Sequence, residues 1–337
     1  MLRRGKNLSC TAPSGTVVLG LLAVVMLLVI PLAGPERYLL KVLDFVGIAV
    51  IVTAGLALLF GYAGQVSLGH AGFVGIGAYT SAHLVSTVGV PWLVGVAAAV
   101  AVSTLGGLIL ALPSLRLRGH YLAMATLGFN EIMYVVFREA RAITGGHDGF
   151  GGIPYPSIGG FTIDTPLGVY LLVWVVAAVV VFFVWSLVQG RPGRAMRALQ
   201  GSEIGAEASG IDTVRLKVRV FALSAGLAGL AGALYAHAIG FISPSTFGLD
   251  QSIIYLAIVV VGGGGSIVGP VVAAVLLSLL PYADALLPNL SKDTVTLLQA
   301  WETDIYGLTM ILVAILVPGG LASLVKRRKG RDQAVKV

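Results

Sequence analysis

The sequence predicts an all-α polytopic membrane protein, and three observations support this fold class. Hydrophobic residues make up 57% of the chain and charged residues only 11%, whereas soluble domains carry about 25% charged residues. The mean hydropathy is +0.95. Apolar runs long enough to cross a bilayer recur along almost the whole chain, so we expect about eight to ten transmembrane helices.

The apolar runs place the expected helices in order along the chain. They lie at 16–34, 38–60, 66–87, 91–112, 121–137, 167–188, 218–239, 253–261, 267–287 and 305–317. The basic start followed by the first run imitates a signal peptide. However, that run is long for a signal peptide and lacks a small-x-small cleavage site, so we expect an uncleaved first helix.

Lysine and arginine residues orient the predicted helices through the positive-inside rule. The basic clusters at 3–6 and 326–331 place both termini in the cytoplasm, and Arg116 and Arg118 mark another inner loop. The predicted organisation is a cytoplasmic tail 1–15, membrane helices 16–188 with an outer loop 139–166, a cytoplasmic loop 189–217, membrane helices 218–318 and a basic tail 319–337. The net charge of +7 therefore reflects topology, and we expect no nucleic-acid partner.

Two glycine-rich segments interrupt the apolar runs. The first spans 61–69, and the second is the Gly-Gly-Gly-Gly-Ser sequence at 262–266, which joins a predicted in-and-out pair of short segments. Each glycine inside a helix costs about 1 kcal/mol relative to alanine, so helices are expected to break at both places. The corresponding positions of the two breaks suggest an internal pseudo-repeat around a central pathway. Two tight cytoplasmic turns would explain the same pattern.

The predicted cytoplasmic loop is unusually charged for this chain, which suggests that something outside the membrane contacts it. Residues Gly201–Ile211 read as a short amphipathic helix, with apolar and acidic side chains on different faces and Gly210 as its stop. Such a helix suits a groove on a cytoplasmic partner, although a solvated helix on the membrane surface has the same pattern. The residues expected to couple to the partner are Glu203, Ile204, Glu207, Ala208 and Gly210.

Several polar residues within or near the spans are candidates for the translocation path, because intramembrane polar groups are costly without a function or a partner. A lone histidine such as His70 is also a common hydrogen-bonded packing residue. For Glu131, the alternative is a structural pair with Arg138, two turns further along the same helix. The path candidates are Gln65, Ser67, His70, Asn130 and Glu131.

The charged loop resembles a known motif. Its segment 203–211, EIGAEASGI, is similar to the EAA-type coupling loop of ABC importer permeases in the form used by the branched-chain amino acid (LivH/LivM) family. The Ile-x-Leu-Pro of the general pattern is missing, a departure typical of that family. Further segments resemble the LivM subfamily, over about residues 40–320: GYAGQVSLGHA at 61–71, RLRGHYLA at 116–123, TLGFNEI at 126–132, ITGG at 143–146, and residues 226–235 and 261–269.

This resemblance implies the permease of an importer in a bacterial plasma membrane. Its partners would be a homologous LivH-type permease, two cytoplasmic ATPase subunits, an extracytoplasmic solute-binding protein and membrane lipid. The sequence contains no Gly-x-x-x-x-Gly-Lys-Ser/Thr motif, so we expect ATP to bind the partner subunits and this chain to hold no cofactor. Leucine, isoleucine and valine are the family's usual solutes, and relatives carry urea, short amides or other small polar solutes.

Two other classes fit the sequence less well. An ion-coupled secondary transporter predicts carboxylates near the helix breaks, but residues 61–78 and 259–270 contain none. A membrane enzyme needs a nucleophile, a base or a metal. Cys10 is the one cysteine of the chain, and His147 with Asp148 lacks a third ligand. We therefore expect no catalytic residue and no metal, and we expect transport by alternating access.

Overall fold

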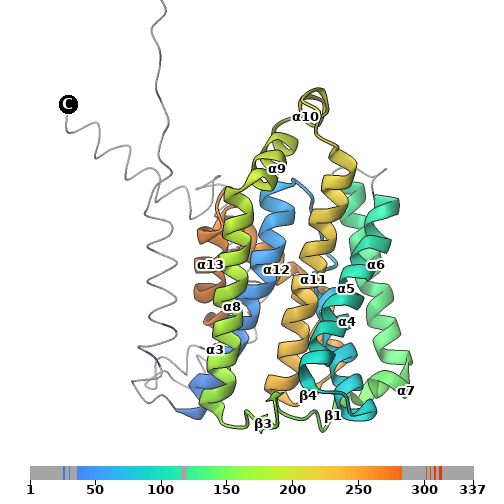
Figure 1. Ribbon diagram of the computed structural model, residues 1–337, viewed down its shortest axis with the longest axis vertical. Coiled ribbons are helices and arrows are strands. Elements are labelled where there is room, and N and C mark those ends of the chain that lie inside the picture. Colours follow the sequence, from blue (N-terminus) through green and yellow to red (C-terminus); the bar gives the residue numbers. More distant parts are fainter. Residues whose placement is uncertain are drawn as a thin grey trace, which may run out of the picture.

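In the computed structural model, the described residues are 36–114 and 120–282, with single positions at 26, 30, 301, 304, 307, 308, 311 and 312. Their helices form an elongated bundle in which the long helices run along a common axis (Figure 1). The predicted fold class, an all-α polytopic membrane protein, is confirmed. Apart from the single positions, the runs 16–34 and 305–317, the two tails, Arg116 and Arg118 lie outside the described residues.

Five described helical segments are long and apolar enough to cross a membrane. They are α3 (Arg37–Ala57) continued by the π-helical turn η2 (Leu58–Tyr62), α5 (Trp92–Ser114), α8 (Pro166–Gln189), α11 (Thr213–Ile239), and η5 (Pro244–Phe247) with α12 (Leu249–Gly262). Less apolar or shorter helices pack beside them: α4 (His70–His83) with η3 (Leu84–Val88), α6 (His120–Glu139), and α13 (Val268–Ser278) with η6 (Leu280–Tyr282). Each predicted run between 38 and 287 thus contains a helix.

The predicted outer loop and the predicted charged loop lie at opposite ends of the bundle (Figure 1). The charged end holds α9 (Arg191–Gly201) and α10 (Glu203–Ala208). The other end holds α7 (Arg141–Thr144), the turn η4 (Gly146–Asp148), a β1–β4 pair (Phe150–Gly151 with Phe241–Ile242) and a β2–β3 hairpin (Ser157–Ile158 with Phe161–Thr162), both antiparallel.

Buried His237 fastens the outer loop to the bundle. Its Nδ1 lies 2.8 Å from the Pro154 carbonyl oxygen, which can only accept, so Nδ1 carries the proton. Its Nε2 therefore accepts from the Ser81 hydroxyl at 2.9 Å. One histidine thus joins α11, α4 and the outer loop.

Small residues let α11 pass through the middle of the bundle, where it packs against α3, α4 and α5. Ala225, Gly229 and Ala233 repeat every fourth residue and are all buried. A Cβ atom added to Gly229 would lie 2.9 Å from the Ala99 carbonyl oxygen of α5. Such spacing lets helix backbones approach closely in lipid.

Candidate functional site

The two predicted glycine-rich breaks meet in space. A Cβ atom added to Gly264 would lie 2.7 Å from the Cα atom of Gly61, and one added to Gly61 would overlap the Gly264 carbonyl oxygen. Only glycine allows this backbone contact. Because α12 and α13 pack against each other, the second break is the tip of the predicted in-and-out pair. A pseudo-repeat around a common centre accounts for the contact between the breaks, and it stays a prediction.

The first break lies within the protein rather than in a solvated turn. Helical structure ends at Tyr62, and α4 begins at His70, with Ser67 and Gly69 buried between them. The first amides of a helix have no partner within that helix, so they need acceptors from elsewhere. The start of α4 is therefore a point where the rest of the fold must provide hydrogen bonds.

Side chains from two other helices provide these hydrogen bonds. The Ala71 amide donates to Ser252 Oγ of α12 at 2.9 Å, and the Gly72 amide donates to Asn130 Oδ1 of α6 at 2.8 Å. The Ser252 hydroxyl also donates to Asn130 Oδ1, at 3.1 Å. Just before the helix, the Leu68 amide donates to Thr126 Oγ1 of α6 at 2.9 Å. We call Thr126, Asn130 and Ser252 the α4 cap, since they hold the broken helix in place.

His70 is held in one orientation by a chain of hydrogen bonds. The Ser224 hydroxyl of α11 donates to the Gly55 carbonyl oxygen of α3 at 2.8 Å, so its oxygen accepts from His70 Nε2 at 2.7 Å. Nδ1 is then the acceptor from the Ser67 hydroxyl at 3.0 Å. Both ring nitrogens of this buried side chain are satisfied, which is the packing arrangement considered for it.

Gln65 differs from the other buried candidates. Its side chain is 9% exposed, and among the described residues Oε1 has no hydrogen-bond partner. Buried polar atoms are normally paired. Of the predicted path residues within the break, Gln65 therefore keeps an open acceptor, whereas Ser67 and His70 use theirs within the protein.

The pairing of Glu131 with Arg138, which was the alternative to a role in the path, is wrong. Arg138 Nε instead lies 3.0 Å from Glu139 Oε1, and the described residues provide no ion pair for Glu131. Seven residues along a helix rise about 10 Å, so the adjacent Glu139 is the nearer partner. Glu131 is exposed on the side of α6 that faces away from the bundle. A charge in the middle of a lipid-exposed helix costs about 3 kcal/mol.

The predicted amphipathic helix is present as α10, but it is shorter than the expected Gly201–Ile211. The Ser202 hydroxyl oxygen accepts from the Gly205 amide at 3.1 Å and caps its start. At its end, the Gly210 amide donates to the Glu207 carbonyl at 2.9 Å and the Ile211 amide to the Ala206 carbonyl at 3.0 Å. Gly210 has φ +79°. This is a Schellman motif, which confirms Gly210 as the stop.

The two acidic residues of α10 fasten it to the start of α11. Glu203 forms an ion pair with Lys217, and Glu207 Oε1 accepts from the Thr213 hydroxyl at 2.7 Å. Helix α11 begins at Thr213, inside the predicted loop 189–217. Ile204, by contrast, is 80% exposed, and Ala208 is exposed on the same helix. The exposed surface of α10 therefore includes apolar residues as well as the exposed Glu207.

Helix α9 connects α10 to the first glycine-rich break. Met196 and Leu199 are the buried apolar side chains of α9. Helix α9 also packs on η2. A Cβ atom added to Gly64 would lie 3.8 Å from Gln200 Cγ. Helix α9 thus provides a packed connection between α10 and the break.

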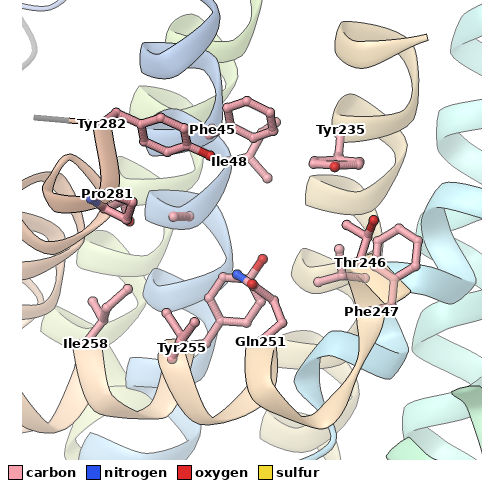
Figure 2. A pocket seen from close by; sticks show the side chains of 14 residues that line it. Phe45, Ile48, Tyr235, Thr246, Phe247, Gln251, Tyr255, Ile258, Pro281 and Tyr282 are labelled. Atoms are coloured by element: carbon pink, nitrogen blue, oxygen red, sulfur yellow. The ribbon is translucent and has the colours of Figure 1, made fainter. Parts of the chain in front are cut away.

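A cavity of about 180 Å³ lies between α3, α11, α12, η5 and η6, and sequence reasoning did not find it (Figure 2). Phe45 stacks on Tyr282 at its rim, with ring centroids 5.9 Å apart. Thr246, Gln251 and Ser278, together with three tyrosines, bring polar groups to a lining that is otherwise apolar. The i, i+4 spacing of Gln251 and Tyr255 on an apolar helix was the available signal. A cavity that combines apolar walls with a set of polar groups is a common form of small-molecule site.

The family model for the permease component of the branched-chain amino acid transport system matches residues 38–314. The chain belongs to this family. The permease is 32% identical to the high-affinity branched-chain amino acid transport permease LivM of Salmonella typhimurium and 31% identical to that of Escherichia coli. Each match covers 96% of this chain and 79% of the relative.

A more distant relative carries a different name. The ribose import permease RbsC of Haemophilus influenzae is 30% identical over 38% of each chain. No solved structure matches the permease. The family match shows that the chain is a multi-pass membrane protein and the permease subunit of an ABC importer. The matched residues include both glycine-rich breaks, the α4 cap and α10.

Proposed function

We propose that this permease moves branched-chain amino acids inward by alternating access. The observation that carries the proposal is the match to the two LivM permeases along 96% of the chain. The match to a ribose permease covers 38% of the chain, so a sugar is the weaker alternative. Urea, short amides and other small polar solutes are alternatives within the same importer class, and ion-coupled transport is a further one.

The proposed energy source lies in separate subunits. Two ATPase subunits bind ATP and contact the α9–α10 end, which is cytoplasmic together with both termini. A homologous permease lies beside this one in the bacterial inner membrane, and a solute-binding protein delivers its cargo at the opposite end. This arrangement is supported by the lack of a P-loop motif in the sequence and by the separation of the two loops in Figure 1.

The proposed coupling surface is the exposed side of α10. Ile204 and Ala208 enter a groove on the ATPase, while Glu203 and Glu207 hold α10 against α11 so that it moves as part of that helix. Gly210 supplies the turn that α10 needs to join α11. The acidic residues thus position the contact rather than make it.

The proposed route of the signal runs from α10 through α9 to the first break, and from there to the α4 cap. Gln65 lines the path with its open acceptor. Ser67, His70 and Asn130 support the path by holding the start of α4. ATP binding can shift the equilibrium between the inward-open and outward-open states only by the difference in ATP affinity between the two states.

Uptake into vesicles tests the solute and the energy source. The complete transporter with its binding protein is expected to concentrate radiolabelled leucine when ATP is supplied inside the vesicle on the ATPase side. Unlabelled valine and isoleucine are expected to compete, whereas urea and ribose are not. Uptake driven by an ion gradient without ATP, or uptake of urea or ribose in place of leucine, would overturn the proposal.

A charge placed on α10 tests the coupling surface. Ile204→Asp is expected to reduce recovery of the ATPase subunits by roughly tenfold, since it puts a charge into an apolar contact. Tyr155→Asp is the matched control, because Tyr155 is also an exposed apolar residue but lies at the opposite end. Glu207→Arg removes the bond to Thr213 and is expected to lower ATP-coupled uptake. Full ATPase recovery and uptake in both variants would exclude docking at α10.

A further inference from the structure

Helix α6 carries a stripe, on the side that faces away from the bundle, that the described helices leave exposed. Helix α6 stands at the edge of the bundle in Figure 1. Glu131 is exposed there, and so are large apolar side chains spaced three or four residues apart on the same side. We call this set, with Gly128, the α6 stripe: Tyr121, Met124, Gly128, Glu131, Ile132 and Val135.

The α6 stripe differs from a surface built for lipid. Between Leu167 and Phe183, the exposed side chains of α8 are all apolar, namely Leu167, Val175, Val179, Phe182 and Phe183, and the mean hydropathy of this helix reaches 2.9. Helix α6 has 20 residues, yet it is not among the five described segments apolar enough to cross a membrane on their own. Glu131 lies about 16 Å from the start of α6, near the middle of a bilayer core of about 30 Å. A carboxylate at that depth needs a partner.

Gly128 adds an independent observation. It lies in the middle of α6, where glycine weakens a helix. A Cβ atom added to it would meet nothing within 4 Å, so packing within the described part of the chain does not require glycine. The glycines within α3, α4, α5, α8 and α11, by contrast, all have atoms of this chain within that distance. An outward-facing glycine one turn from Glu131 leaves room for another helix backbone.

We propose that the α6 stripe is the seam with a second, non-identical permease subunit, which presents a cationic or hydrogen-bond-donating side chain to Glu131. The second subunit is taken from the proposed function, on which this inference rests. A twofold contact between identical chains uses the same patch on both sides. Two helices crossing at Gly128 would then bring two Glu131 carboxylates together in the membrane, whereas a different subunit can offer the opposite charge.

Site-directed photocrosslinking tests the seam in the assembled transporter in lipid nanodiscs. Cys10→Ser removes the native cysteine, and Ile132→Cys or Val179→Cys then receives a benzophenone maleimide. The two positions match, since Ile132 is 63% exposed and Val179 61% exposed. We expect adducts with the second permease at Ile132 to exceed those at Val179 by roughly tenfold, as for a fully covered interface position. Mass spectrometry identifies the captured chain.

Three results would overturn the proposed seam. They are lipid as the main adduct at Ile132, capture of a second copy of this chain, or equal yields of protein adduct at both positions. The readout does not depend on the solute. A complex that takes up leucine without an Ile132 adduct overturns the seam alone. A complex that forms the adduct but transports no leucine overturns the proposed function alone.

Charge reversal tests the partner's chemistry. Glu131→Lys is expected to weaken association with the second permease by roughly a hundredfold, because a buried charge pair becomes a repulsive one. Glu139→Lys is the matched control, since it makes the same change at an exposed position at the end of α6. Reversal of the captured donor in the second permease is expected to restore assembly with Glu131→Lys. Unchanged recovery of the second permease with Glu131→Lys would overturn the proposed pairing.

Discussion

Asn130 and Glu131 are neighbours in the chain, yet α6 places them in opposite environments. The Asn130 side chain is fully buried, and its Oδ1 accepts from the Gly72 amide and the Ser252 hydroxyl. Glu131 is exposed and has no ion pair among the described residues. One residue of helix turns the side chain by about 100°, which is enough to separate the two. Polarity in a membrane helix therefore has two uses, one inside the chain and one toward another subunit.

The two sides of α6 also differ in what a mutation should disturb. The inner side holds the start of α4, so changes there act on the stability of the isolated subunit. The residues on the side of α6 that faces away from the bundle are exposed in the described part of the chain, so we expect changes there to act on assembly. Measurements on the isolated subunit and on the complex can therefore separate the two sides.

Asn130→Leu is expected to have the largest effect. The change leaves the Gly72 amide and the Ser252 hydroxyl without their acceptor in a buried position. The free energy of unfolding of the isolated subunit is expected to fall by about 3 kcal/mol, since each unsatisfied donor costs about 1 to 3 kcal/mol. Denaturant titration of the detergent-solubilised subunit measures this. Glu131→Gln, one residue away, is expected to leave the stability unchanged. Equal losses of unfolding free energy for Asn130→Leu and Glu131→Gln would contradict the different environments of the two residues.

A double-mutant cycle on His70 and Ser224 is expected to have the next largest effect. His70→Phe alone should lower the free energy of unfolding by about 2 kcal/mol, since it leaves the Ser67 and Ser224 hydroxyls without the imidazole. Ser224→Ala is expected to lower the free energy of unfolding less in the His70→Phe variant than in the wild type, with a coupling energy of about 1 kcal/mol. Strict additivity of the two substitutions would contradict the hydrogen bond between them.

Gly128→Ala is expected to have the smallest effect, with opposite signs in the two measurements. The free energy of unfolding of the isolated subunit should rise by about 0.5 to 1 kcal/mol, because alanine favours a helix and its Cβ meets nothing in this chain. Recovery of the second permease should fall, because the added methyl group separates the backbones. Gly77→Ala provides the contrast, since a Cβ there overlaps the Gly229 carbonyl oxygen within this chain. If the Gly128→Ala variant recovers the second permease in full, the proposed seam at α6 loses support.

Much of the fold could be predicted from the sequence. Runs of apolar residues located the helices between 38 and 287, because a segment in a bilayer must satisfy its backbone hydrogen bonds internally. Gly210 was recognised as the stop of α10, since a positive φ at a helix end favours glycine. The helix break after Gly61 was also predicted, because glycines inside an apolar run disfavour a continuous helix.

The candidate site was harder to predict. Polarity alone selected Gln65, Ser67, His70, Asn130 and Glu131 as one group, but the structure gives them three different environments. Ser67, His70 and Asn130 are hydrogen-bonded inside the chain, Gln65 is buried with an open acceptor, and Glu131 faces outward. Their hydrogen-bond partners lie as far as 154 residues away. Sequence spacing cannot reveal such pairs, and for the same reason it did not reveal the cavity beside Tyr255.

The sequence by itself determined the membrane location, the positions of the helices and breaks, and the family, since each depends on local composition or on contiguous motifs. Tertiary structure alone decided that the two breaks touch, that α6 and α12 cap α4, and that the acidic residues of α10 face α11. The physical reason is that a buried hydrogen bond needs both of its partners. The side of a helix that a residue occupies has meaning only once the neighbouring helices are in place.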